Sequence, residues 1–169
     1  MSKIAFTLAA FLVMVTSSSS GAAGLPDPAA AKAAASCQQA IAKAGTTFAA
    51  ASSKSLGKCY AGVFKCVQTK PGDQACIAKA VATCGQETST KAPLARVKMT
   101  AAIAKKCGSF ADLSNADGLG FTTLASECQT DFGTTLADVG SVSECIRAQH
   151  ECLAELAFSV AMPRTGQLA

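Results

Sequence analysis

The residues best suited to chemistry are nine cysteines and one histidine in a chain of 169 residues. Cys145, His150 and Cys152 lie within about two helical turns and offer the sulfur and imidazole ligands that bind zinc or copper. On a helix, Cys145 and Cys152 share a face, whereas His150 points about 140° away from Cys145. One helix cannot easily aim all three at one ion. We therefore expect His150 at the surface, with a metal or thiol-redox site on these residues as the alternative.

Motifs of enzymes are missing from the sequence. It has no Gly-x-Ser-x-Gly, no Cys-x-x-Cys and no glycine-rich phosphate-binding motif. We therefore expect a protein that is not an enzyme and uses no cofactor.

The start of the chain has the order of a signal peptide. Lys3 precedes an uncharged run from Ile4 to Val15, and small residues follow up to Gly24. That run would rise only about 18 Å as a helix, against roughly 30 Å for a bilayer core. The pattern predicts a signal peptide over residues 1–23, a secreted or periplasmic protein, and no transmembrane segment.

Export would place the cysteines in an oxidising compartment, where they are expected to pair. Those of the first half recur at helical spacing, on a stripe with about 3.6 residues per step. Residues 70–73 (KPGD) predict a turn after this helix, with Asp73 as the cap of the next one. Gly85 is expected to stop that second helix, and a third would run from near Thr90 to Gly108.

An antiparallel hairpin about this turn would place certain cysteines opposite one another. In such a hairpin, partners lie at nearly equal sequence distances from the turn. The break after Gly85 could shift the register of the outermost pair. The expected disulfides are Cys66–Cys76, Cys59–Cys84 and Cys37–Cys107.

Beyond the hairpin, Ser109 to Gly120 is expected to be a loop, and a short helix should run from Phe121 to Thr130. Ser141 and Glu144 have the spacing of a capping box at the head of a last helix. Cys128 could pair with Cys145 or with Cys152. One cysteine must then be free, pair with a second chain or bind something.

Charge divides the chain into two parts. Residues 24–110 hold twelve Lys/Arg and three Asp/Glu, whereas residues 111–169 hold two and eight. The acidic part could neutralise the basic part by packing against it. Alternatively, the basic face could bind an anionic envelope component. Nucleic acid is not expected, because no aromatic residues interleave the lysines.

The sequence thus predicts an all-α fold in which a disulfide-stapled antiparallel helical hairpin is followed by a smaller C-terminal helical pair. The expected parts are a signal peptide (1–23), a basic hairpin (24–108), an acidic helical pair packing on it (109–162) and a loose tail (163–169). The expected function is a non-enzymatic structural or binding role with an unknown partner, for which an anionic envelope component and another protein are the candidates. A carrier of a small apolar ligand or lipid is the first alternative, and a metal or thiol-redox protein the second.

Overall fold

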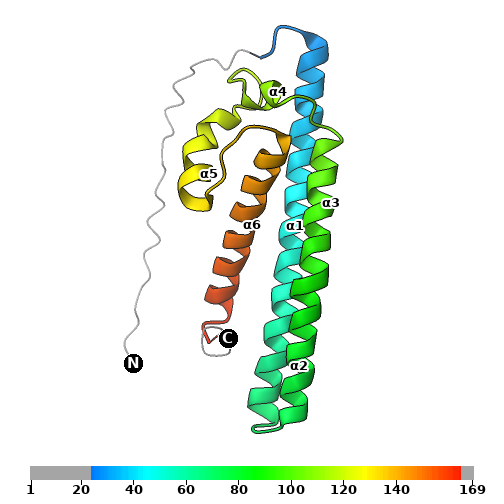
Figure 1. Cartoon of the computed structure of the whole chain (residues 1–169), viewed down its shortest axis with the longest axis vertical. Coiled ribbons are helices and arrows are strands. Elements are labelled where there is room, and N and C mark those ends of the chain that lie inside the picture. Colours follow the sequence, from blue (N-terminus) through cyan, green and yellow to red (C-terminus); the bar gives the residue numbers. More distant parts are fainter. Residues whose placement is uncertain (1–23, 165–169) are drawn as a thin grey trace, which may run out of the picture.

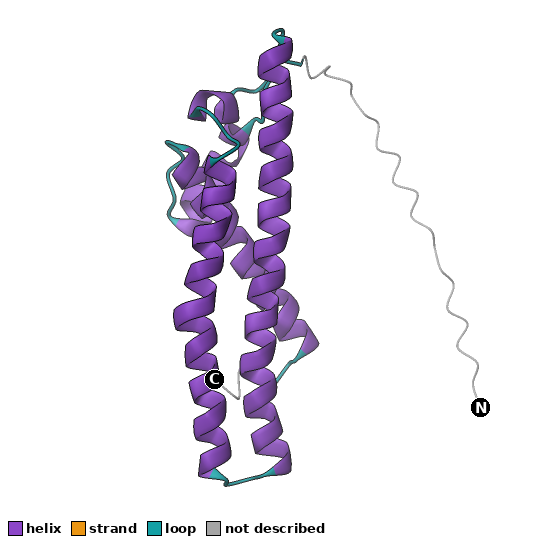
Figure 2. Ribbon diagram, turned by 90° about the vertical axis from the view of Figure 1, so that its right-hand side faces the viewer, coloured by secondary structure: helices purple, strands orange, loops and turns teal. Residues whose placement is uncertain are grey.

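The computed structural model describes residues 24–164, and every regular element in this range is helical (Figures 1 and 2). The predicted signal peptide and the last five residues of the predicted tail lie outside the described residues. The all-α prediction and the antiparallel hairpin are confirmed. The elements are α1 (Pro28–Thr69), α2 (Gln74–Gln86), the π-helix η1 (Glu87–Lys91), α3 (Ala92–Ala104), α4 (Phe110–Ser114), the 3-10 helix η2 (Phe121–Leu124), α5 (Ala125–Phe132) and α6 (Val139–Ala161).

One arm of the hairpin is a single helix, α1, of 42 residues and about 63 Å. The Asp27 carboxylate accepts hydrogen bonds from the backbone N–H groups of Ala29 and Ala30, which no intrahelical partner could satisfy. The turn that follows α1 places Gly72 at φ 82°, a conformation that glycine adopts without steric cost. Asp73 then caps α2 by accepting from the Cys76 N–H.

The other arm is continuous, and the prediction of a helix stop at Gly85 was wrong. Gly85 stays helical, and η1 joins α2 directly to α3. Pro93 explains why the joint is a π-helix, because its ring lacks an N–H and would meet the carbonyl four residues before it. The wider π turn opens the ladder of hydrogen bonds just before this proline, so the chain continues without a break.

Disulfides join the two arms at three levels and join α5 to α6. The three pairs in the hairpin are the ones that equal distance from the turn predicts, and Cys128 takes the first of its two alternatives. Cys152 is free and exposed. The disulfides are Cys66–Cys76, Cys59–Cys84, Cys37–Cys107 and Cys128–Cys145.

Helix α6 packs along both α1 and α3, and the larger core residues lie where the three helices meet (Figure 1). Its buried face carries Val142 and Ile146, and Leu113 of α4 closes the upper end. The largest buried side chains of this core are Phe48, Met99, Ile103, Leu113, Val142 and Ile146.

The beginnings of the C-terminal helices differ from the prediction. Asp138, not Ser141, is the N-cap of α6, and the two residues exchange hydrogen bonds in a reciprocal capping box. The expected loop 109–120 contains α4, and the expected helix 121–130 is divided into η2 and α5. Sequence alone misplaces such ends because Ser and Asp residues a few positions apart, such as Asp138 and Ser141, can each serve as a cap.

None of the helices within residues 24–164 combines the length and the apolar character needed to cross a membrane.

Candidate ligand-binding groove

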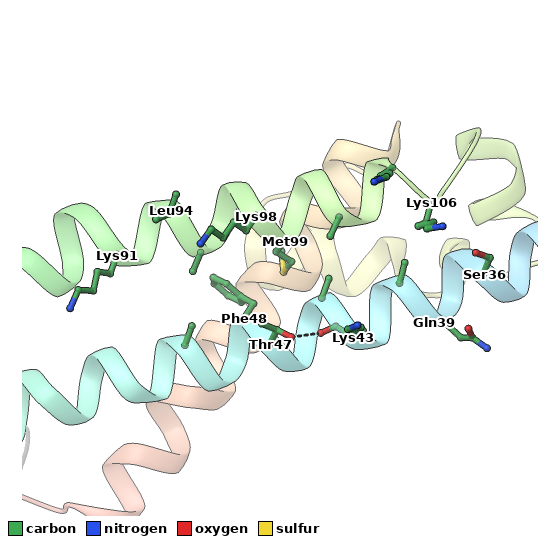
Figure 3. A pocket seen from close by; sticks show the side chains of 16 residues that line it. Ser36, Gln39, Lys43, Thr47, Phe48, Lys91, Leu94, Lys98, Met99 and Lys106 are labelled. Carbon is green, nitrogen blue, oxygen red and sulfur yellow. Dashed lines mark hydrogen bonds between the residues drawn. The ribbon is translucent and has the colours of Figure 1, made fainter.

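A groove of about 840 Å³ runs between α1 and α3 (Figure 3). Helix α6 lies behind this helix pair in Figure 3 and contributes no residue to the groove, so the groove opens on the side that α6 leaves uncovered. The lining residues are Ser36, Gln39, Ala40, Lys43, Ala44, Thr47, Phe48, Ala51, Lys91, Leu94, Ala95, Lys98, Met99, Ala102, Lys105 and Lys106.

Small side chains make the hollow. Five alanines from the two helices line it, at positions 40, 44, 51, 95 and 102. A methyl group cannot fill the space between two helices, whereas larger side chains would interdigitate across it. Phe48 and Met99, which are almost fully buried, lie in the middle of the groove. The result is a trough with a largely apolar floor.

The rim of the groove is cationic and lacks carboxylates. Five of the lining residues are lysines and none is Asp or Glu. Lys91 is bound to Glu87, with 2.6 Å between Nζ and Oε1. The other four, at positions 43, 98, 105 and 106, form no ion pair within residues 24–164. The groove therefore carries uncompensated positive charge.

Glu87 forms a buried polar cluster beside the end of the groove that is lined by Lys91. Its carboxylate accepts hydrogen bonds from Lys91, Lys58 and the Ser55 hydroxyl, and only 3% of its side chain is exposed. The Lys91 ammonium is the main cause that lowers the pKa of Glu87 to about 2, although desolvation acts in the opposite direction. The same hydrogen bond raises the pKa of Lys91. This cluster attaches η1 to α1.

Acid should therefore loosen the attachment of η1. Because the folded-state pKa of Glu87 lies below its usual value of 4.5, its stabilising effect is full above about pH 4.5 and is lost as the pH falls towards 2. We expect the unfolding free energy of the wild type to fall more steeply over that range than that of Glu87→Gln, which does not titrate. Urea unfolding at stepped pH measures both. Parallel curves would contradict this account.

His150 was expected at the surface; it is partly exposed, and its ring lies against α1. Its Nδ1 atom is buried and has no hydrogen-bond partner within the described chain. A Cβ atom added at Gly45 would lie only 2.8 Å from its Nε2 atom. The imidazole therefore occupies the space that a side chain at position 45 would fill. The spacing of His150 from Cys145 and Cys152 gave no sign of this partner, which lies 105 residues earlier in the chain.

The three candidate metal ligands are not brought together. The Cys145 sulfur is bonded to Cys128, Cys152 is exposed, and His150 faces Gly45. No group of three His, Cys, Asp or Glu side chains within residues 24–164 could hold a metal ion.

The acidic part of the chain reaches the basic hairpin through Arg96 and Glu151, whose Nε and Oε1 atoms lie 2.9 Å apart. Glu151 also binds Arg147 of its own helix, as does Glu144. These carboxylates lie along α6, whereas the lysines of the groove face away from it. Packing of α6 thus leaves the charge of the groove unneutralised.

In comparisons with protein-family models, with curated proteins and with solved structures, no match to this chain was found.

Proposed function

We propose that this protein is an exported, non-enzymatic binding protein that carries a small apolar ligand in the groove between α1 and α3. The observation that carries the proposal is the groove itself. Its volume falls within the roughly 300–1,000 Å³ typical of small-molecule sites, and its floor is apolar. Its lining holds no His, Cys, Asp or Glu side chain, which supports a binding role over a catalytic one.

The disulfides support a groove that exists before the ligand arrives. Cys37–Cys107 holds the two helices together at one end, and Cys59–Cys84 holds the arms beyond the other. The Glu87 cluster attaches η1 to α1 between these two points. Since the walls are fixed, a ligand need not spend binding free energy on ordering them.

Filling the groove should abolish binding. We expect Ala102→Trp to weaken the uptake of a fluorescent fatty-acid probe by about tenfold or more, because the indole would project from the wall of the groove into the space that the ligand needs. Ala101→Trp is the matched control, since Ala101 is its exposed neighbour on α3 and does not line the groove. Titration of the probe by fluorescence measures both affinities.

Organic extraction of protein purified from its native source, followed by mass spectrometry, should release a bound lipid. Finding neither a released lipid nor any probe uptake would contradict the carrier role. It would favour the alternative of a protein-interaction role, for which the exposed Leu153, Leu156 and Val160 on α6 would be the natural surface.

A further inference from the structure

The two ends of the groove differ in polarity. The end next to the Cys37–Cys107 disulfide is lined by Ser36, Gln39, Ala40, Ala102, Lys105 and Lys106, and Lys43 lies on α1 one turn beyond Gln39. The rest of the groove, towards η1, is lined mainly by apolar side chains (Figure 3). These apolar residues are Ala44, Phe48, Ala51, Leu94, Ala95 and Met99.

The cations at the two ends also differ in what they can bind. Lys91, at the apolar end, already binds Glu87. Lys105 and Lys106 at the polar end, and Lys43 one turn beyond Gln39 on α1, form no ion pair within the described residues. Lys98 lies between the ends and adds to the same positive field. An anion in the groove would therefore gain most at the end near the disulfide.

The groove is long and narrow. Its lining on α1 extends from Ser36 to Ala51, a rise of about 22 Å, and the partner residues on α3 run antiparallel beside it. A ligand that covers this floor is extended and apolar along the stretch from Ala44 to Ala51, and a negative charge on it is best placed towards the end near the disulfide.

Resting on the proposed carrier function, we infer that the ligand is a fatty-acid anion with an alkyl chain of about twelve carbons or more. Its carboxylate binds among Lys43, Lys105 and Lys106, and its chain lies over Phe48 towards Leu94. The lysine ammonium groups supply charge-assisted hydrogen bonds to the carboxylate, and their methylene stems extend the apolar wall. An acidic amphipathic helix is a poorer match, because Lys91 at the apolar end is already paired with Glu87 and would leave the carboxylates of a helix there without a cation.

Calorimetric titration with three amphiphiles of one chain length tests this inference. Laurate is anionic, dodecanol is neutral and dodecyltrimethylammonium is cationic, while the apolar chain is the same. We expect laurate to bind about tenfold or more tightly than dodecanol, and the cation to bind most weakly. Added salt should weaken the binding of laurate and leave that of dodecanol unchanged.

Two triple variants test the place of the carboxylate. Lys43→Gln, Lys105→Gln and Lys106→Gln together should cost laurate about tenfold in affinity and leave dodecanol within about twofold. The matched control replaces Lys54, Lys65 and Lys79 by Gln; it removes the same charge from exposed positions that do not line the groove. Equal melting temperatures of the two variants would show that the change at the C-terminus of α3 acts on binding and not on folding.

The outcomes separate the inference from the function on which it rests. Equal affinities for laurate and dodecanol, both abolished by Ala102→Trp, would overturn the carboxylate assignment and leave the carrier role intact. An equal loss in both triple variants would overturn the place of the carboxylate. Binding of none of the three amphiphiles, or of an acidic helical peptide in their place, would overturn the inference and the carrier function together.

Discussion

Reduction of the four disulfides is expected to unfold the helices of this protein. Few large apolar side chains are buried, and alanine and cysteine make up much of what the interior contains. A core this thin gives little margin over the conformational entropy of the chain. The disulfides supply that margin by restricting the unfolded state. Circular dichroism of the reduced and alkylated protein measures the loss of helix.

Removal of one disulfide at a time should lower the unfolding free energy, and the loss should increase from the disulfide nearest the turn to the outermost one. Chain-entropy reasoning gives about 2.7 kcal/mol for the loop closed by Cys66–Cys76 and about 4.4 kcal/mol for that closed by Cys37–Cys107, whose sequence separations are 10 and 70. The outer value is an upper estimate, because the inner disulfides already shorten its loop. The outer cysteines are also buried in the core, so their loss removes packing as well.

Replacement of both partners of a disulfide by Ala, followed by urea unfolding, tests this gradient. The variants are best made in a Cys152→Ser background, since the free exposed thiol could otherwise exchange with the remaining disulfides. Cys152→Ser alone serves as the control and should leave the unfolding free energy within about 0.5 kcal/mol. Reduced protein that keeps its helix signal and melting temperature would show that packing alone holds the fold. An inner pair that matters more than the outer one would contradict the loop argument.

The hairpin could be predicted from sequence because its signals are local and redundant. The turn at Pro71-Gly72, the cap at Asp73 and the helical spacing of the cysteines all indicate one register. The error at Gly85 has the opposite origin. Gly85 predicts a helix end by its preference for a left-handed stop, but the arm that contains it is tied to α1 by Cys59–Cys84 on one side and Cys37–Cys107 on the other, and it remains helical.

The sequence allowed the prediction that the protein could hold a small apolar ligand, but not where the ligand would bind. Alanine-rich helix faces suggested room for an apolar ligand, but not which faces would stay open. That depends on which side of the α1/α3 pair α6 covers, and α6 reaches this pair through contacts distant in sequence, such as Phe48 with the Val142 and Ile146 face. The apolar stripe through Cys37, Ile41 and Phe48 indicates which face of α1 turns inward, but it does not show which helix covers that face or that the neighbouring face lines a groove.

The contact between α6 and α1 at Gly45 should make a Gly→Ala substitution destabilising, whereas the same substitution elsewhere in a helix is normally stabilising. In the interior of a helix, Gly→Ala normally raises stability by up to about 1 kcal/mol. At Gly57 the added methyl would meet only Phe158, at an ordinary 3.8 Å, so Gly57→Ala should stabilise the protein. At Gly45 the methyl would lie 2.8 Å from the His150 Nε2 atom, and we expect Gly45→Ala to destabilise it by about 1–3 kcal/mol.

A double-mutant cycle between Gly45 and His150 isolates the cause, because the two changes share one contact. In a His150→Ala background the clash is gone, and Gly45→Ala should then stabilise the protein by up to about 1 kcal/mol, as Gly57→Ala does in the wild type. Urea unfolding of the four proteins gives the coupling free energy. Should Gly45→Ala stabilise both backgrounds equally, the imidazole can swing aside at little cost. The close approach of α6 to α1 would then depend on the Val142 and Ile146 side and not on the missing side chain at position 45.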